Sequence, residues 1–266
     1  MPFLEAPRVI YRNNPLDRVI CQFRFPPILR IDKEIPADFQ ERIRKDFPGF
    51  SEKKELALAM PQRIQKEFPP DPLRQIIQIQ NEGKNYEFTS EDGIWTVNLT
   101  RTFLALTTTK YKRREDFKKR LKVPLEALVD IYKPTYFSRI GLRYVDIIKR
   151  SVLKLEEVGW CELLQPYALG LLSAPGVRDR VRGLESKYEV LLEDNSSMAR
   201  IVTALMTWQE NNNEECFMID TDFYTTQKTE IGDGDGKLDY FHVRASRLIQ
   251  WFITKRLHEA MEPDTL

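Results

Sequence analysis

The sequence predicts an α+β fold in which long helices cover an antiparallel sheet. Each half of the chain ends in a segment with apolar residues at helical spacing, at about 114–132 and 238–261. Between these segments lie short runs of strand-forming residues separated by turn residues. Runs of antiparallel strands followed by amphipathic helices are typical of sheets that helices cover on one side.

The first half, residues 1–136, is expected to run strand, helix, several strands, long helix. A helix is expected after Pro36, because Phe39, Ile43 and Phe47 follow at helical spacing. Residues 61–72, with their prolines, are expected to form a loop. Strands are expected at 19–25, 54–60, 74–80, 86–89, 94–101 and 103–111.

The second half, residues 137–266, repeats this order. It begins with the central strand FSRIGLRYVDII, residues 137–148, and continues with broken helix over 155–172. Strands are expected at 187–193, 198–208 and 216–225, a flexible turn at 232–236 and the final helix at 238–261. The order predicts two pseudo-repeated halves, tightly associated, and resembles TATA-binding-protein-like or helix-grip duplications.

Composition favours a soluble cytoplasmic protein. Charged residues make up 30% of the chain, which suits a solvated surface, and no apolar run approaches the roughly 20 residues of a membrane span. Three scattered cysteines fit neither a disulfide framework nor a zinc site. Residues 1–136 carry a net charge of +6 and residues 137–266 one of −5, so the halves can attract each other or face different partners.

Four stretches spread over the chain carry a family resemblance. They are NPLDRVICQFRFPPI (14–28), LTTTKYKRREDF (106–117), the central FSRIGLRYVDII and LDYFHVRASRLIQWFITKRLHEAM (238–261). Together they resemble a sporadically distributed prokaryotic family of roughly this length whose function is uncharacterised. The resemblance implies no catalytic residues. The family's patchy occurrence implies an association with mobile elements or host defence.

The segment KYKRREDFKKRLK, residues 110–122, concentrates basic residues at the start of the first long helix. Such clusters bind phosphate backbones through counterion release. The candidate nucleic-acid contacts are Lys112, Arg113, Arg114, Lys118 and Lys119. The alternative is the solvated face of an amphipathic helix, because Phe117 and Leu121 must face the core.

Arg139 and Arg143 lie on one face of the central strand, about 13 Å apart at the rise of a strand. Guanidinium groups on a concave face suit a carboxylate or phosphate ligand. Under a covering layer they would instead need acidic partners, for which Asp220 and Asp222 are the natural candidates. These four residues are the candidate binding site, and a structural ion-pair network is the favoured interpretation.

Metal binding and catalysis have little support in the sequence. The run from Asp233 places Lys237 and Arg244 where a calcium loop needs acidic or amide ligands. His242 and His258 would lie about 24 Å apart on one helix, too far to act on one atom. The sequence contains no nucleophile elbow, phosphate loop or zinc-hydrolase motif. We therefore expect no cofactor and no metal, and favour a protein that is not an enzyme.

The sequence thus predicts a non-catalytic binding or adaptor protein that engages a protein partner, in a prokaryotic system linked to defence or mobile elements. The first alternative is nucleic-acid or nucleotide binding through the basic segment and Arg139 and Arg143. The second alternative is an enzyme of unrecognised type. No membrane association is expected, and the sequence indicates no oligomeric state.

Overall fold

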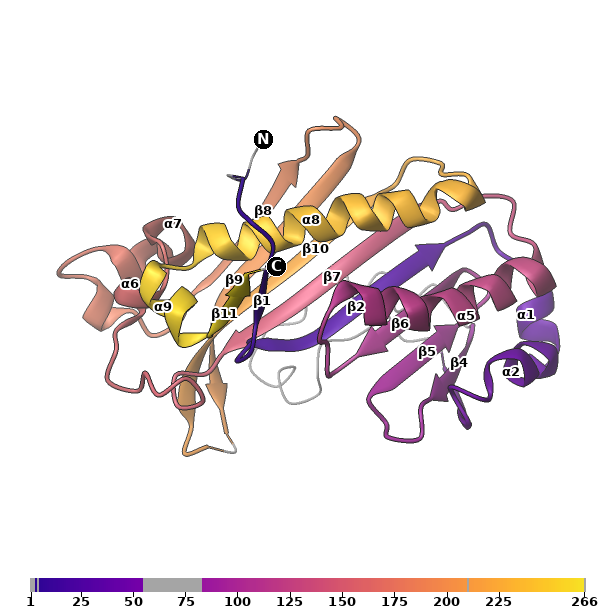
Figure 1. The fold of residues 1–266 in the computed structure, drawn as a ribbon, viewed down its shortest axis with the longest axis horizontal. Coiled ribbons are helices and arrows are strands. Elements are labelled where there is room, and N and C mark those ends of the chain that lie inside the picture. Colours follow the sequence, from indigo (N-terminus) through magenta and orange to yellow (C-terminus); the bar gives the residue numbers. More distant parts are fainter. Residues whose placement is uncertain (1–2, 4, 55–82, 210, 266) are drawn as a thin grey trace.

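In the computed structural model, an antiparallel sheet runs through the whole protein (Figure 1). The structure describes residue 3 and residues 5–54, 83–209 and 211–265. Within them, nine strands form the sheet in the order β3-β4-β5-β6-β2-β7-β10-β9-β8. The strands are β2 Leu16–Arg24, β3 Gly49–Lys54, β4 Lys84–Thr89, β5 Trp95–Leu99, β6 Phe103–Thr108, β7 Arg139–Ile148, β8 Glu185–Leu191, β9 Ser197–Trp208 and β10 Glu214–Thr225.

Two long helices, α5 (Arg114–Tyr132) and α8 (Gly234–Phe252), lie on the same face of this sheet (Figure 1). The shorter helices are α1 Arg30–Lys33, α2 Ala37–Ile43, α6 Trp160–Leu163, α7 Pro166–Leu169 and α9 Lys255–Ala260. Three 3₁₀ turns are η1 Gly170–Ser173, η2 Arg178–Arg180 and η3 Ile231–Asp233. The predicted α+β class, with antiparallel strands under helices, is confirmed. No helix in the described part of the chain is long and apolar enough to span a bilayer.

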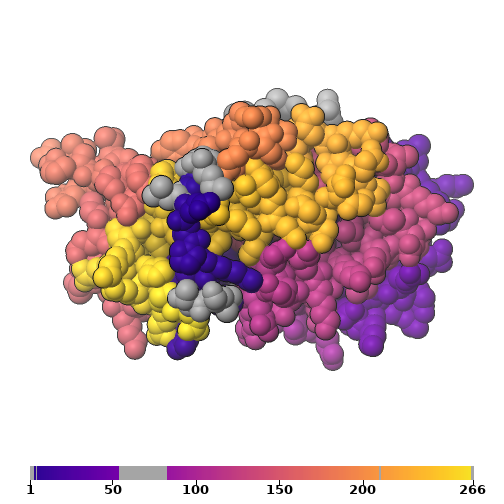
Figure 2. Space-filling view, turned by 45° about the horizontal axis from the view of Figure 1, so that its top comes forward, coloured from indigo at the N-terminus to yellow at the C-terminus, as the bar shows by residue number. Residues whose placement is uncertain are grey.

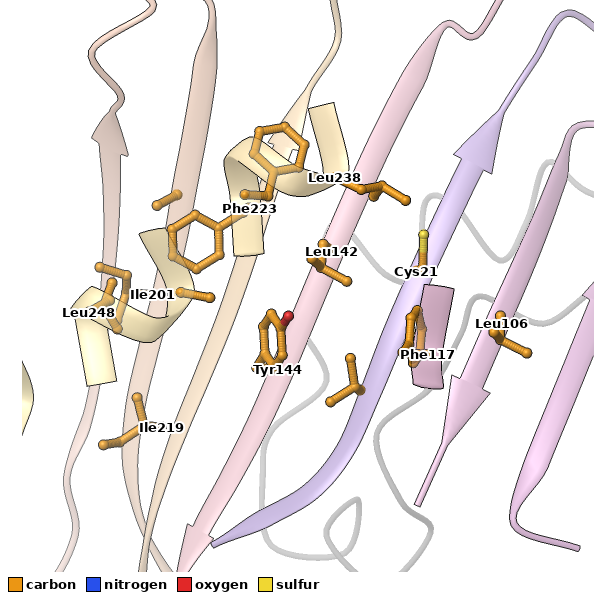
Figure 3. Close-up of a cluster of buried hydrophobic side chains, with 14 of the residues drawn as sticks. Cys21, Leu106, Phe117, Leu142, Tyr144, Ile201, Ile219, Phe223, Leu238 and Leu248 are labelled. Atoms are coloured by element: carbon orange, nitrogen blue, oxygen red, sulfur yellow. The ribbon is translucent and has the colours of Figure 1, made fainter. Parts of the chain in front are cut away.

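The core fills the space between the sheet and the two long helices. Alternate residues of each strand face the helices, because successive side chains of a strand point to opposite faces. Leu142 and Phe223 from the sheet meet Phe117 of α5 and Leu238 and Leu248 of α8, all buried (Figure 3). Burial of this apolar surface is the main favourable term that holds the helices on the sheet.

Strand β7 occupies the middle of the sheet, as its sequence predicts. It pairs antiparallel with β2 on one side and with β10 on the other. The sheet is therefore continuous across residues 1–136 and 137–266. Within this sheet, the first strand of each segment, β2 or β7, lies beside the last, β6 or β10. The division into two repeated halves, and the TATA-binding-protein-like or helix-grip likeness, remain predictions.

The N-terminal segment returns to the end of the chain. Strand β1 (Val9–Tyr11) pairs antiparallel with β11 (Pro263–Thr265) in a small separate ribbon. Arg12 reinforces it with two hydrogen bonds to Asp264, at 2.9 and 2.7 Å. The Tyr11 hydroxyl is 2.8 Å from Nδ1 of His258 in α9. Residues 9–12 are thereby fixed against the C-terminal part of the chain.

The C-terminal helix differs from the prediction in two places. The expected turn at 232–236 instead contains the start of α8, and a Cβ on Gly234 would come within 3.1 Å of Phe23 and 3.3 Å of Phe137. The single helix expected over 238–261 is broken at Ile253. There the Thr254 amide donates to the carbonyl of Leu163, and α9 begins after Thr254.

The other predicted elements lie close to their expected positions, except where they fall outside the described residues. The hairpin of β4 and β5, the α5 helix and strands β8 to β10 are confirmed. Strand β3 begins at Gly49, earlier than the strand expected at 54–60. The expected loop at 61–72, the strand at 74–80 and almost all of the strand at 54–60 lie outside the described residues.

Candidate functional site

A pocket of about 110 Å³ opens on the helix-covered side of the sheet, between the start of α5, the middle of α8 and the N-terminal segment. Figure 2 shows this segment lying across the C-terminal helices and reaching the residues near the start of α5. The lining residues are Arg8, Val9, Ile10, Tyr11, Asn14, Pro15, Leu16, Tyr111, Lys112, Arg113, Arg114, Tyr144, Asp146, Thr221, His242, Ala245, Ser246, Leu248 and Ile249. Five segments that are distant in sequence therefore build it.

The sheet supplies the floor of the pocket. Tyr144 and Asp146 alternate along β7 and face the helices, and Thr221 of β10 is the registered neighbour of Tyr144. All three residues are buried. Their positions follow from the alternation of β7, in which Ile140, Leu142 and Tyr144 share one face. Asp146 continues that series, so an acidic side chain stands where an apolar residue is expected.

A hydrogen-bonded group of aromatic and imidazole side chains forms one wall. The Tyr144 hydroxyl is 2.9 Å from Nδ1 of His242 on α8, and the Tyr144 ring packs edge-on against Tyr111 with the centroids 5.9 Å apart. Burial, together with the positive charges of Arg114 and Arg8, lowers the pKa of His242 to about 4. Burial also raises the pKa of Tyr111 to about 12. Both groups are therefore neutral near pH 7.

Asp146 is the one acidic side chain among the lining residues, and it is 6% exposed. Burial, together with the negative charge of Asp220 across the sheet, raises the pKa of its carboxyl to about 7. Among the described residues, no group donates a hydrogen bond to this carboxyl or forms an ion pair with it. Buried polar groups are nearly always paired, so an unpaired carboxyl facing a cavity marks a candidate binding site.

Ion pairs hold the mouth of the pocket together. Arg8 from the N-terminal segment makes two hydrogen bonds of 2.8 Å to Glu115 of α5, which lowers the pKa of that carboxyl to about 2. Arg114 pairs with Asp239 of α8. Exposed Lys112 has no ion-pair partner in the part of the chain that the structure describes. Most of the positive charge at the mouth is thus already compensated.

The candidate residues of the central strand lie on the opposite face of the sheet. Arg143 binds Asp220 in a bidentate pair, with Nε–Oδ1 2.7 Å and Nη2–Oδ2 2.5 Å. Arg139 is 2.8 Å from Asp222, which also accepts from Arg200 at 3.2 Å. The predicted ion pairing is confirmed. Whether these residues bind a ligand remains a prediction.

The basic segment is partly committed to structural contacts. Lys118 is 2.6 Å from Asp235 and 3.0 Å from Asp239, so it joins Arg114 in linking α5 to α8. Arg113 pairs with Asp116 one turn along α5. Lys112 and Lys119 keep no ion-pair partner among the described residues. Of the five predicted nucleic-acid contacts, only these two lysines therefore carry a positive charge that no described acidic side chain neutralises.

The acidic residues of β10 and those at the start of α8 lie in separate ion pairs. Asp220 and Asp222 pair with arginines in the sheet, whereas Asp235 and Asp239 pair with α5. In the residues that the structure describes, no group of three or more His, Cys, Asp or Glu side chains is placed to hold a metal ion.

Sequence reasoning missed the pocket, although one signal for it exists. Asp146 interrupts the run Tyr144–Ile148 on the face that must be buried. An acid at such a position needs a partner or a function. The roles of Tyr111 and His242 have no comparable signal, because their contact with Tyr144 depends on how α5 and α8 dock.

Comparison with known proteins identifies no relative: no protein-family model and no curated protein matches this chain. The family resemblance therefore stays a prediction. The function is argued from the site, since a fold alone does not specify one.

Proposed function

We propose that this protein is a non-catalytic binding module and that the pocket between α5 and α8 is its ligand-binding site. The observation that carries the proposal is the buried, unpaired carboxyl of Asp146 in a small cavity with mainly apolar walls. Concave, mostly apolar sites with a few converging polar groups are the usual small-molecule sites of proteins. The three free cysteines, two of them buried, agree with a reducing cytoplasmic setting.

Binding is favoured over catalysis because the reactive groups near the pocket are occupied. His242 is held by Tyr144, and His258, which is not a lining residue, is held by Tyr11. Burial raises the pKa of the Cys21 thiol well above its usual range, so this cysteine is a poor nucleophile. Asp146 is the strongest candidate for a general base if the protein is instead an enzyme.

The test is a titration of the ¹⁵N-labelled protein with benzene, a single neutral ring, followed by amide chemical shifts. The proposal expects saturable shifts confined to Leu16, Tyr144–Asp146 and Ala245–Ile249. A Ser246→Leu variant, which places a larger side chain in the pocket, should abolish them. Shifts elsewhere, or shifts that persist in this variant, would contradict the assignment.

A second candidate function, adaptor binding to a protein partner, rests on the sheet edge at β8. In the described part of the chain, β8 pairs only with β9, so its outer edge has backbone groups available to another strand. Leu191 at the end of β8 is 52% exposed. Affinity capture from a prokaryotic host should recover a partner with the parent protein and lose it with Glu189→Pro, which removes one strand N–H. Equal recovery would exclude this edge.

Nucleic-acid binding remains the alternative for the basic segment, with Lys112 and Lys119 as its open cations. Its test is fluorescence anisotropy with short DNA and RNA at low and moderate salt. If the lysines contact phosphates, the affinity for nucleic acid should fall steeply as salt rises. The double variant Lys112→Ala/Lys119→Ala should bind more weakly than the parent. Binding that this variant leaves unchanged would remove the segment from consideration.

A further inference from the structure

The pocket's dimensions limit its ligand to a small body. A cavity of about 110 Å³ is somewhat smaller than the cavity of about 150 Å³ that binds benzene in an engineered protein. Leu16 from β2 and Ala245, Leu248 and Ile249 from α8 supply apolar walls. The space therefore suits one ring or a short branched chain, with any larger part of the ligand outside the mouth.

The polar character of the pocket is set by Asp146. The residue as a whole is 6% exposed, and its carboxyl has no hydrogen-bond donor or cation among the described residues. The neighbouring imidazole cannot serve as the missing cation, because burial lowers the pKa of His242 to about 4. A ligand that enters the pocket meets an acceptor and a negative charge without compensation.

The cations at the mouth do not fill this role either. Arg8 is held by both carboxylate oxygens of Glu115, and Arg114 is held by Asp239. On the other face of the sheet, Arg143 is committed to Asp220. Each of these three arginines thus already has an acidic partner. The positive charges of Arg114 and Arg8 still act inside the pocket, since both lower the pKa of His242, and Lys112 lines the mouth without an ion-pair partner among the described residues. The direct contact of a ligand cation with Asp146 must outweigh this repulsion.

On these grounds we infer that the pocket binds a small amine with a ring-sized apolar body, and that Asp146 is the counterion of its ammonium group. The inference rests on the proposed function, since it names the ligand class of the same pocket. An ammonium group supplies both things that the carboxyl lacks, a positive charge and several N–H donors. A hydroxyl or amide supplies a donor alone, and a plain ring supplies neither.

The test compares benzylamine with toluene, which has the same ring and no donor. Binding is measured by ligand-observed and ¹⁵N-amide NMR titration of the parent protein and of three variants. Asp146→Asn keeps the shape of the side chain and removes its charge. Ser246→Leu blocks the cavity. Asp179→Asn removes an exposed carboxylate far from the pocket in sequence and serves as the control. Circular dichroism checks that each variant is folded.

We expect the parent to bind benzylamine at least about tenfold more tightly than toluene, which is the preference that a buried charged hydrogen bond provides. Asp146→Asn should reduce the ratio of the two affinities to near one, and Asp179→Asn should leave it unchanged. Ser246→Leu should weaken both ligands. Because the ratio is taken within each variant, a general loss of affinity does not imitate the expected result.

Two other results are informative in different ways. If both probes bind equally well, if Asp146→Asn changes neither, and if Ser246→Leu still weakens both, the pocket is a binding site but the amine inference is wrong. If neither probe shifts the resonances of the pocket residues in the parent, the proposed binding site is itself refuted.

Discussion

Replacing Asp146 by asparagine should change how stability depends on pH. In the folded protein, burial and the charge of Asp220 raise the pKa of Asp146 from 3.8 to about 7. Between these values the folded state binds more protons than the unfolded state, so the free energy of unfolding falls as pH rises. The pKa difference of about 3 means that ionisation of Asp146 lowers the free energy of unfolding by about 4 kcal/mol. This destabilisation is complete above about pH 8 and absent below about pH 3.

Asparagine does not titrate, so Asp146→Asn should gain stability relative to the parent as pH rises. From about pH 5 to pH 8, the free energy of unfolding of the variant should rise by about 2.5 kcal/mol relative to that of the parent. The assay is urea unfolding at both pH values, followed by tryptophan fluorescence and extrapolated linearly to water. Any constant effect of the amide cancels, because only the change with pH is compared.

Asp179→Asn is the matched control, since Asp179 has an 86% exposed side chain. Its stability difference from the parent should be the same at both pH values. If Asp146→Asn behaves like this control, Asp146 is not a buried, uncompensated carboxyl, and the basis for the pocket assignment fails.

Three further substitutions test other contacts, each by chemical denaturation. Arg143→Ala should cost about 3–5 kcal/mol, because Asp220 is left buried without its partner; Arg143→Met/Asp220→Leu should recover most of this. A cost below about 1 kcal/mol would contradict a buried pair. Gly141→Ala should lower stability by about 1 kcal/mol, since a Cβ there overlaps the Arg139 guanidinium and must displace it. Thr254→Ala should cost about 1 kcal/mol by removing the α9 N-cap, and no loss would show that the cap contributes nothing.

The sheet was predictable because its pattern is local. In β7, Ile140 and Leu142 alternate with Arg139 and Arg143, so the sequence itself assigns the two faces. The acidic partners followed from the same alternation in β10. What remained open was whether that face binds a ligand, and neither strand contains information about it.

The C-terminal break was not predictable, because its cause is distant in sequence. Residues 238–261 keep helical spacing of apolar residues, with no proline or glycine between Leu238 and Met261. The chain leaves the helix at Ile253, where the Leu164–Ile253 bridge and the Thr254–Leu163 hydrogen bond replace helical bonds. Tertiary contacts here override local propensity.

In the structure, Asp146 is a better candidate ligand contact than Asp220 or Asp222. Sequence reasoning placed Asp220 and Asp222 in the candidate binding site with Arg139 and Arg143, although it favoured a structural ion-pair network for these four residues. In the structure those arginines satisfy both acids, so an incoming ligand would have to break a buried pair before gaining a contact. Asp146 has no such pair to break, and a ligand cation would lower the cost of its burial. A carboxylate without a partner is therefore the better candidate, and only the assembled fold distinguishes it from the paired ones.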